Sequence, residues 1–107
     1  MPSIRDTYMD DYGISERETR DLEELCKTAQ GKELMWVLES AQNANPLIAS
    51  EIFANLTLEL GYDRLSQTSF IPMQRKVFQG YRRRTLKNLS DRLTMEKQKK
   101  NLKISSF

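Results

Sequence analysis

The sequence predicts an all-α fold, a small bundle of four to five helices with a helix-turn-helix and a long basic helix at its C-terminal end. Apolar residues recur at spacings of three and four along most of the chain, which is the periodicity of one helix face. The 4 glycines and 3 prolines stand almost entirely where helices would begin or end. With 107 residues, 38% of them hydrophobic, the chain is expected to form one domain without a large enzyme cleft.

The N-terminal third predicts an arm followed by one helix. Residues 1–14 are expected to form a frayed acidic arm. Ser15 followed by Glu18 is a capping box, in which the serine accepts a hydrogen bond from a main-chain N–H group and the glutamate reaches back to the cap. A helix is therefore expected over residues 16–30, and Gly31 would end it in a left-handed conformation.

The middle of the chain predicts two more helices. The segment 32–43 is more apolar than a helix of its length requires, so we expect it to be buried on two sides. Asn45 would cap the next helix, with Pro46 at the first helical position, where the missing N–H group costs nothing. Gly61 is expected to end that helix.

The C-terminal part predicts a short helix over residues 62–66 and a long helix over residues 73–100. Only Gly80 interrupts the long helix, at a cost of about 1 kcal/mol relative to alanine. Beyond Leu93 the chain has little apolar surface to bury, so the helix there is expected to be solvated or frayed, and residues 94–107 are expected to form a basic frayed tail.

These elements define the expected domain organisation. A single helical domain would span residues 15–93, and its part over residues 46–93 has the element spacing of a helix-turn-helix. No run approaches the roughly 18 apolar residues of a membrane span, and the first residues lack the apolar run of a secretory signal. We therefore expect a cytoplasmic protein without a membrane partner.

The charged residues divide the chain into two unlike parts. The net charge of the whole chain is only +2. Residues 1–63 carry 13 acidic and five basic side chains, whereas residues 64–107 carry 12 basic and two acidic ones. An asymmetry of this size suggests that one part of the chain binds a polyanion.

The predicted long helix carries the candidate nucleic-acid-binding residues. In a helix-turn-helix the first turns of the last helix enter the major groove, where arginine pairs with guanine and glutamine with adenine. The candidates are Gln74, Arg75, Lys76, Gln79, Arg82, Arg83, Arg84 and Lys87. Three consecutive arginines span about 200° of a helix, so about two would contact phosphates. The third would cover the core or pair with the acidic part of the chain. The alternative is a solvated helix face that balances the acidic part.

Other residues define further surfaces. Asp21, Glu23 and Glu24 form a possible acidic partner surface, which would either pack against the basic helix or imitate DNA. A homodimer through an apolar edge is also plausible, and its residues would be Leu86, Leu89 and Leu93.

The composition argues against an enzyme. The chain has no histidine, no glycine-rich phosphate loop and no nucleophile constellation. Its single cysteine, Cys26, lies on the apolar stripe of the first helix and is expected to be an inert core thiol. We therefore expect no catalytic residues, no metal site and no cofactor.

One stretch of the sequence resembles a known group of proteins. The run from Phe70 to Arg84, FIPMQRKVFQGYRRR, is similar to the C-terminal signature of small proteins encoded by phages and mobile elements of Firmicutes. Upstream runs around Tyr12 and Asn45 agree with it, so that the resemblance covers most of residues 12–93. Met73 and Gln79 depart from the pattern, since a cysteine and a tyrosine are expected there.

The resemblance implies a function. Such proteins are similar in layout to the promoter-reading region four of sigma factors and to phage late-gene transcription regulators, which implies that Gln74, Arg75 and Lys76 read DNA. The first hypothesis is therefore a phage-type transcriptional regulator that binds duplex DNA, with residues 15–43 as support or as a contact to RNA polymerase. The alternative is an anti-defence, anti-CRISPR-like inhibitor that binds a nuclease or its nucleic-acid channel through its polarised charges.

Overall fold

The computed structural model describes residues 3–105, with side chains through Lys100. Within these residues it contains five α-helices and three short 3-10 helices, and no strand, so the all-α prediction is confirmed. The α-helices are α1 (Glu16–Thr28), α2 (Lys32–Ala44), α3 (Ala49–Leu58), α4 (Tyr62–Ser66) and α5 (Arg75–Ser105). The 3-10 helices are η1 (Ile4–Asp6), η2 (Met9–Tyr12) and η3 (Pro46–Ile48).

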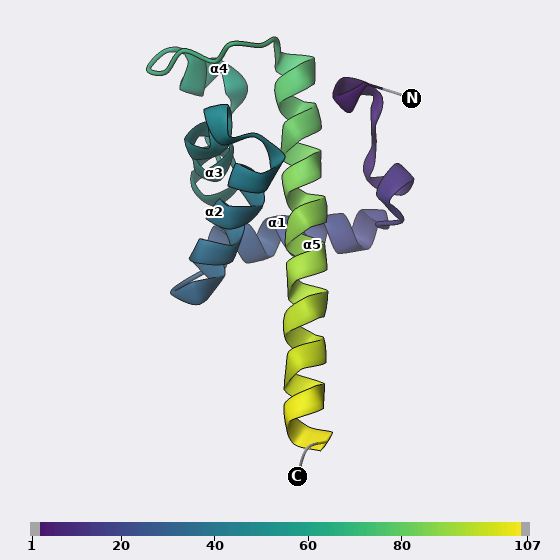
Figure 1. Cartoon of the computed structure of the whole chain (residues 1–107). Coiled ribbons are helices and arrows are strands. Elements are labelled where there is room, and N and C mark those ends of the chain that lie inside the picture. The colour runs from purple at the N-terminus through teal and green to yellow at the C-terminus, as the bar shows by residue number, and fades with distance from the viewer. Residues whose placement is uncertain (1–2, 106–107) are drawn as a thin grey trace.

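Helix α5 is the axis of the molecule (Figure 1). Helices α2 and α3 lie along one side of its N-terminal half, the segment with η1 and η2 lies along the other side, and α1 crosses it near its middle. The C-terminal half of α5 extends beyond the other helices (Figure 1). The fully buried side chains include Val37, Ile48, Ile52, Phe78, Leu86 and Leu89. The core therefore lies between α2, α3 and the N-terminal half of α5.

The predicted cap at Ser15 is confirmed, but the prediction that Gly31 ends the first helix is wrong, because α1 ends at Thr28 and Ala29 already has an extended conformation. The Ser15 hydroxyl accepts a hydrogen bond from the Glu18 main-chain N–H at 3.1 Å, and it donates one to the Glu18 carboxylate at 3.2 Å. Gly31 has a φ of 60° and separates α1 from α2, in a conformation that a side chain would strain. Two segments that are adjacent in sequence can therefore turn sharply and both contact α3.

The third predicted helix differs at both ends. The Asn45 side chain caps it by accepting from the Leu47 N–H at 3.0 Å, but Pro46 opens the 3-10 helix η3 before α3 begins. The prediction that Gly61 ends the helix is wrong, because Glu59 already has a left-handed φ of 58°. The Asn55 amide donates to the Leu60 carbonyl at 2.8 Å and holds the chain as it leaves the helix.

The long helix is shifted towards the C-terminus relative to the prediction. It begins at Arg75 rather than Met73, because the Met73 N–H donates to Ile71 in a turn and the Met73 carbonyl accepts from the Tyr62 hydroxyl. The prediction that this helix continues to residue 100 is confirmed, and residues 94–105 are part of α5, solvated through Lys100, rather than the frayed tail that was the other expectation. Glu, Gln and Lys are good helix formers, and no glycine or proline follows Gly80. Residues 106–107 lie outside the described residues.

The N-terminal arm, residues 3–14, is not frayed as the sequence suggested. It forms η1 and η2 and packs on α5, while Ile14 is buried against the core. Gly80 makes this contact possible, because a Cβ atom there would lie 2.4 Å from the Ile4 carbonyl oxygen. Residues 1–2 of the predicted arm lie outside the described residues.

The predicted dimer edge is wrong for two of its three leucines. Leu86 and Leu89 are completely buried, because they face α2 and α3 rather than solvent. Only Leu93 is half-buried and borders an open groove. In the described part of the chain, none of the helices is long and apolar enough to cross a membrane.

Candidate nucleic-acid interface

Four of the predicted site residues share one face of α5. Lys76, Gln79, Arg83 and Lys87 follow one another at spacings of three, four and four, and we call them the basic stripe. Lys76 is exposed, whereas the other three are half-buried. Gln74, just before the helix, is exposed as well. The stripe therefore begins at an accessible end of α5 and becomes more covered further along.

Arg82 points away from the stripe and into the molecule. Its Nε donates to the Asn55 side-chain oxygen at 2.6 Å, and its Nη2 lies 2.8 Å from the Glu23 carboxylate. The two charged side chains are only 22% and 31% exposed. The expectation that one of the three arginines pairs with the acidic part of the chain is thus confirmed, and Arg82 is not available to a phosphate.

Arg83 lies on the stripe and is held by the N-terminal arm. Its Nε donates to the Thr7 carbonyl at 2.6 Å, and its Nη2 donates to the Arg5 carbonyl at 3.1 Å. Its guanidinium also lies over the Tyr8 ring, 5.0 Å from the ring centre. Arg84 is exposed and lies over the Tyr12 ring at 5.7 Å. The arm thus contacts both arginines that do not face the core.

Two further basic candidates, Arg75 and Lys87, form ion pairs with aspartates. Arg75 at the start of α5 pairs with Asp63 on α4 at 2.5 Å, and the two side chains are 59% and 75% exposed. Lys87 pairs with Asp91 one turn along α5 at 2.6 Å. An ion pair as exposed as that of Arg75 and Asp63 contributes about 0–1 kcal/mol, so an incoming phosphate could replace the Asp63 carboxylate at small cost, whereas the Lys87 side chain is only 26% exposed.

The three residues of the predicted acidic partner surface do not share one environment. Glu23 is bound to Arg82, whereas Asp21 and Glu24 are exposed on α1. The structure therefore neutralises part of the charge difference between the two ends of the sequence.

Burial also accounts for the properties of Cys26, as the sequence suggested. The thiol has no exposed surface, and its burial raises its pKa from 9.0 to about 11. Because the thiolate is the reactive form, the side chain is an inert part of the core.

An open groove lies between α1, α2 and the C-terminal half of α5. It encloses about 1330 Å³. Apolar side chains from all three helices line it, namely Leu22, Leu25, Trp36 and Leu93. Glu18 and Asp21 border it on α1, and Lys97 and Lys100 border it on α5. The groove thus joins an apolar lining to an acidic side on α1 and a net basic side on α5, where Glu96 lies among Lys97, Lys99 and Lys100.

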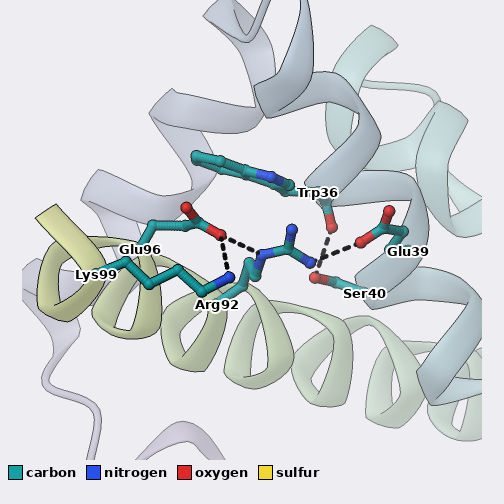
Figure 2. A network of polar contacts seen from close by, with 6 residues as sticks. All are labelled: Trp36, Glu39, Ser40, Arg92, Glu96 and Lys99. Carbon is teal, nitrogen blue, oxygen red and sulfur yellow. Dashed lines mark hydrogen bonds and ion pairs between the residues drawn. The ribbon is translucent and has the colours of Figure 1, made fainter. Parts of the chain in front are cut away.

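One polar cluster at the groove was not predicted from the sequence. Figure 2 shows Arg92 beneath the Trp36 ring, between Glu39 on α2 and Glu96 on α5. Its Nη1 lies 2.7 Å from Glu39 and its Nε lies 3.0 Å from Glu96, and Lys99 approaches the same Glu96 at 3.7 Å. The i,i+4 spacing of Arg92 and Glu96 is a signal that the sequence contains. No local pattern connects Arg92 with Glu39, because they meet only when α2 packs on α5.

Neither the family models, nor the curated proteins, nor the solved structures with which the chain was compared contain a match to it.

Proposed function

We propose that this protein binds duplex DNA through the N-terminal half of α5. The observation that carries the proposal is the basic stripe, which begins at the exposed start of a helix that follows two shorter helices, α3 and α4. This order of elements is that of a helix-turn-helix, in which the N-terminal residues of the last helix contact base edges. The N-terminal pole of α5 also favours a nearby phosphate.

The roles of the candidates follow from their exposure. Gln74 and Lys76 are exposed at the start of α5 and would contact base edges or phosphates first. Arg75 would exchange Asp63 for a phosphate, since its present ion pair is on the surface. Arg82 has no role in this proposal because it is bound within the fold.

A DNA-binding role of this kind is that of a phage-type transcriptional regulator in the cytoplasm of a bacterial host. The resemblance of the run from Phe70 to Arg84 to small proteins of phages and mobile elements supports this proposal. In such a regulator α1 and α2 would support the DNA-binding helix or contact RNA polymerase.

The salt dependence of DNA binding tests the proposal. A pool of random-sequence duplexes is titrated at several salt concentrations, with fluorescence anisotropy as the measure of binding. If about four phosphates are neutralised, the logarithm of the affinity falls with the logarithm of the salt concentration at a slope of about −3.6. Absence of binding to any duplex at low salt contradicts the proposal.

A pair of variants locates the interface. Lys76→Gln removes one exposed charge of the stripe and is expected to reduce the salt slope by about 1. Arg17→Gln removes an exposed charge from α1, which is not part of the stripe, and should leave the slope unchanged. Equal effects of the two substitutions would show that binding follows net charge rather than the stripe.

The groove favours a second candidate function, that of an inhibitor that binds a partner protein. We propose that its occupant would be an amphipathic helix whose basic edge lies against Glu18 and Asp21 and whose acidic edge lies against Lys97 and Lys100. Its apolar stripe would cover Leu25 and the other apolar lining residues. A volume of about 1330 Å³ accommodates about three turns of helix.

Trp36, the only tryptophan, reports on this candidate directly. A synthetic amphipathic helix with lysines on one edge and glutamates on the other is titrated into the protein, and the Trp36 emission is followed. A saturable shift that Leu25→Glu abolishes supports the second candidate. An identical shift with a peptide of all-acidic edges, or no shift, contradicts it. Light scattering on the protein alone identifies a second copy as the occupant, which also overturns this candidate.

A further inference from the structure

We propose that the N-terminal arm is an autoinhibitory segment, which covers the basic stripe at Arg83 and must leave before the full stripe contacts DNA. This inference rests on the proposed DNA-binding function and adds its regulation. It concerns Arg83 first, because this side chain lies in the middle of the stripe and is the one that the arm holds by hydrogen bonds.

The arm occupies the donors that a phosphate would need. A guanidinium binds phosphate through two parallel N–H groups in a fixed fork. Arg83 directs its Nε and Nη2 to the main-chain oxygens of Thr7 and Arg5 instead. Since both are main-chain acceptors, almost any side chain at positions 5 and 7 preserves the contact. The arm and a DNA backbone therefore compete for the same donors.

Gly80 shows how closely the arm lies on this face of α5. A Cβ atom at position 80 would lie 2.4 Å from the Ile4 carbonyl oxygen, 2.7 Å from the Ile4 carbonyl carbon and 3.1 Å from the Arg5 nitrogen. All three are main-chain atoms, so no side-chain rotation relieves the overlap. Glycine inside a helix is unfavourable by about 1 kcal/mol relative to alanine, and here it allows the arm to pack.

The arm is held in a way that permits its release. Among its described residues only Ile14, at the junction with α1, is fully buried, and Met9 and Tyr12 are half-buried against the core, while Ser3, Arg5, Asp6, Tyr8, Asp10 and Asp11 are exposed. Gly13, with a φ of 74°, stands just before this anchor. Segments with few buried apolar contacts open at low free energy. The arm also carries three acidic side chains and one basic one, so its charge favours the stripe and a stronger polyanion can displace it.

The substitution Gly80→Ala tests the inference. It adds a methyl group where the arm lies, and it exchanges a poor helix former for the best one, so α5 itself is expected to persist. The arm should detach. If the open state makes up about 1–10% of the unsubstituted protein, the affinity for random-sequence duplexes should rise about 10- to 100-fold. Deletion of residues 2–13, which retains Ile14 and the Ser15 cap, should give the same increase.

The control is Gly61→Ala. It makes the same chemical change at an exposed glycine whose Cβ atom would meet nothing within 4 Å, and it should leave arm and affinity unchanged. Release of the arm is measured separately, by hydrogen exchange of the Asp6 and Thr7 amides, which are hydrogen-bonded within the arm.

The outcomes separate the two proposals. Faster exchange in the arm together with tighter DNA binding supports autoinhibition. Faster exchange with unchanged DNA affinity overturns autoinhibition and leaves the DNA-binding function in place. Unchanged exchange in Gly80→Ala overturns the contact on which the inference depends. If neither the complete protein nor the two arm-released proteins bind any duplex, the proposed function itself fails, and autoinhibition fails with it.

Discussion

The two halves of α5 belong to one continuous helix but lie in different surroundings. Residues 75–89 lie between α2 and α3 on one side and the N-terminal arm on the other, and they include three fully buried large apolar side chains, Phe78, Leu86 and Leu89. Arg92 still pairs with Glu39 on α2, but from residue 94 the helix extends beyond the bundle, and most of its described side chains there are exposed (Figure 1). Packing therefore determines the conformation of the first half, whereas local helix propensity sustains the second.

The type of basic residue differs between the halves in a way that matches these surroundings. Arginine dominates where the helix is packed, and Arg82 and Arg83 each reach two acceptors on other elements. Lysine dominates the extension, as in Lys97, Lys99 and Lys100, which are exposed. A planar guanidinium can join several acceptors at once, while an ammonium group stays hydrated. A run of arginines therefore does not by itself indicate a binding surface.

The largest contrast between the halves is expected from the removal of an apolar side chain. Phe78 is fully buried and packs edge-on against the Tyr62 ring at 5.6 Å, so Phe78→Ala should lower the free energy of unfolding by about 3–5 kcal/mol. Met95→Ala in the extension should change it by no more than about 0.5 kcal/mol. Urea denaturation followed by far-ultraviolet circular dichroism measures both. Comparable losses would mean that the extension is packed in solution, as it would be in a dimer.

Much of this difference could be predicted from the sequence. The periodicity of Val77, Phe78, Tyr81, Leu86 and Leu89 indicates one buried face, and its loss after Leu93 indicates where packing ends. The helix nevertheless continues beyond Leu93 to Ser105, and it is solvated through Lys100 rather than frayed. Helix formation there depends on propensity and on pairs such as Arg92 with Glu96, which do not need a core.

The candidate site was less predictable. Helical spacing places Arg82, unlike Arg83 and Arg84, on the face of Phe78, Leu86 and Leu89, but it does not show which groups Arg82 meets there. That depends on Glu23 and Asn55, which reach Arg82 only after α1 and α3 have packed on α5. The arm contact depends on main-chain oxygens of Arg5 and Thr7, which no side-chain pattern reveals. Gly80 was the available signal, because a glycine within a long helix indicates a close approach when no turn explains it.

A second, smaller contrast separates two neighbouring arginines. Arg82→Ala leaves Glu23 and Asn55 without their partner in a partly enclosed site, and it should cost about 1–3 kcal/mol of unfolding free energy. Arg84→Ala removes an exposed side chain and should cost about 0.5 kcal/mol. A double-mutant cycle with Glu23→Gln isolates the ion pair from the rest of the effect. No coupling between positions 23 and 82 would show that the pair is absent in solution.

The smallest expected effect lies in the extension and depends on pH. The hydrogen bond from Arg92 lowers the pKa of Glu96, and Lys99 lowers it further. A carboxylate whose pKa is lower in the folded than in the unfolded chain adds stability above its unfolded pKa, about 4.3 for glutamate, and loses it as the pH falls through the folded pKa. The complete protein should therefore be more stable than Glu96→Gln at neutral pH, and the two should converge in acid. Lys99→Gln keeps the bond to Arg92 and should retain most of the pH dependence. If the unsubstituted protein and Glu96→Gln differ in stability by the same amount at every pH, Arg92 pairs with Glu39 alone and not with Glu96.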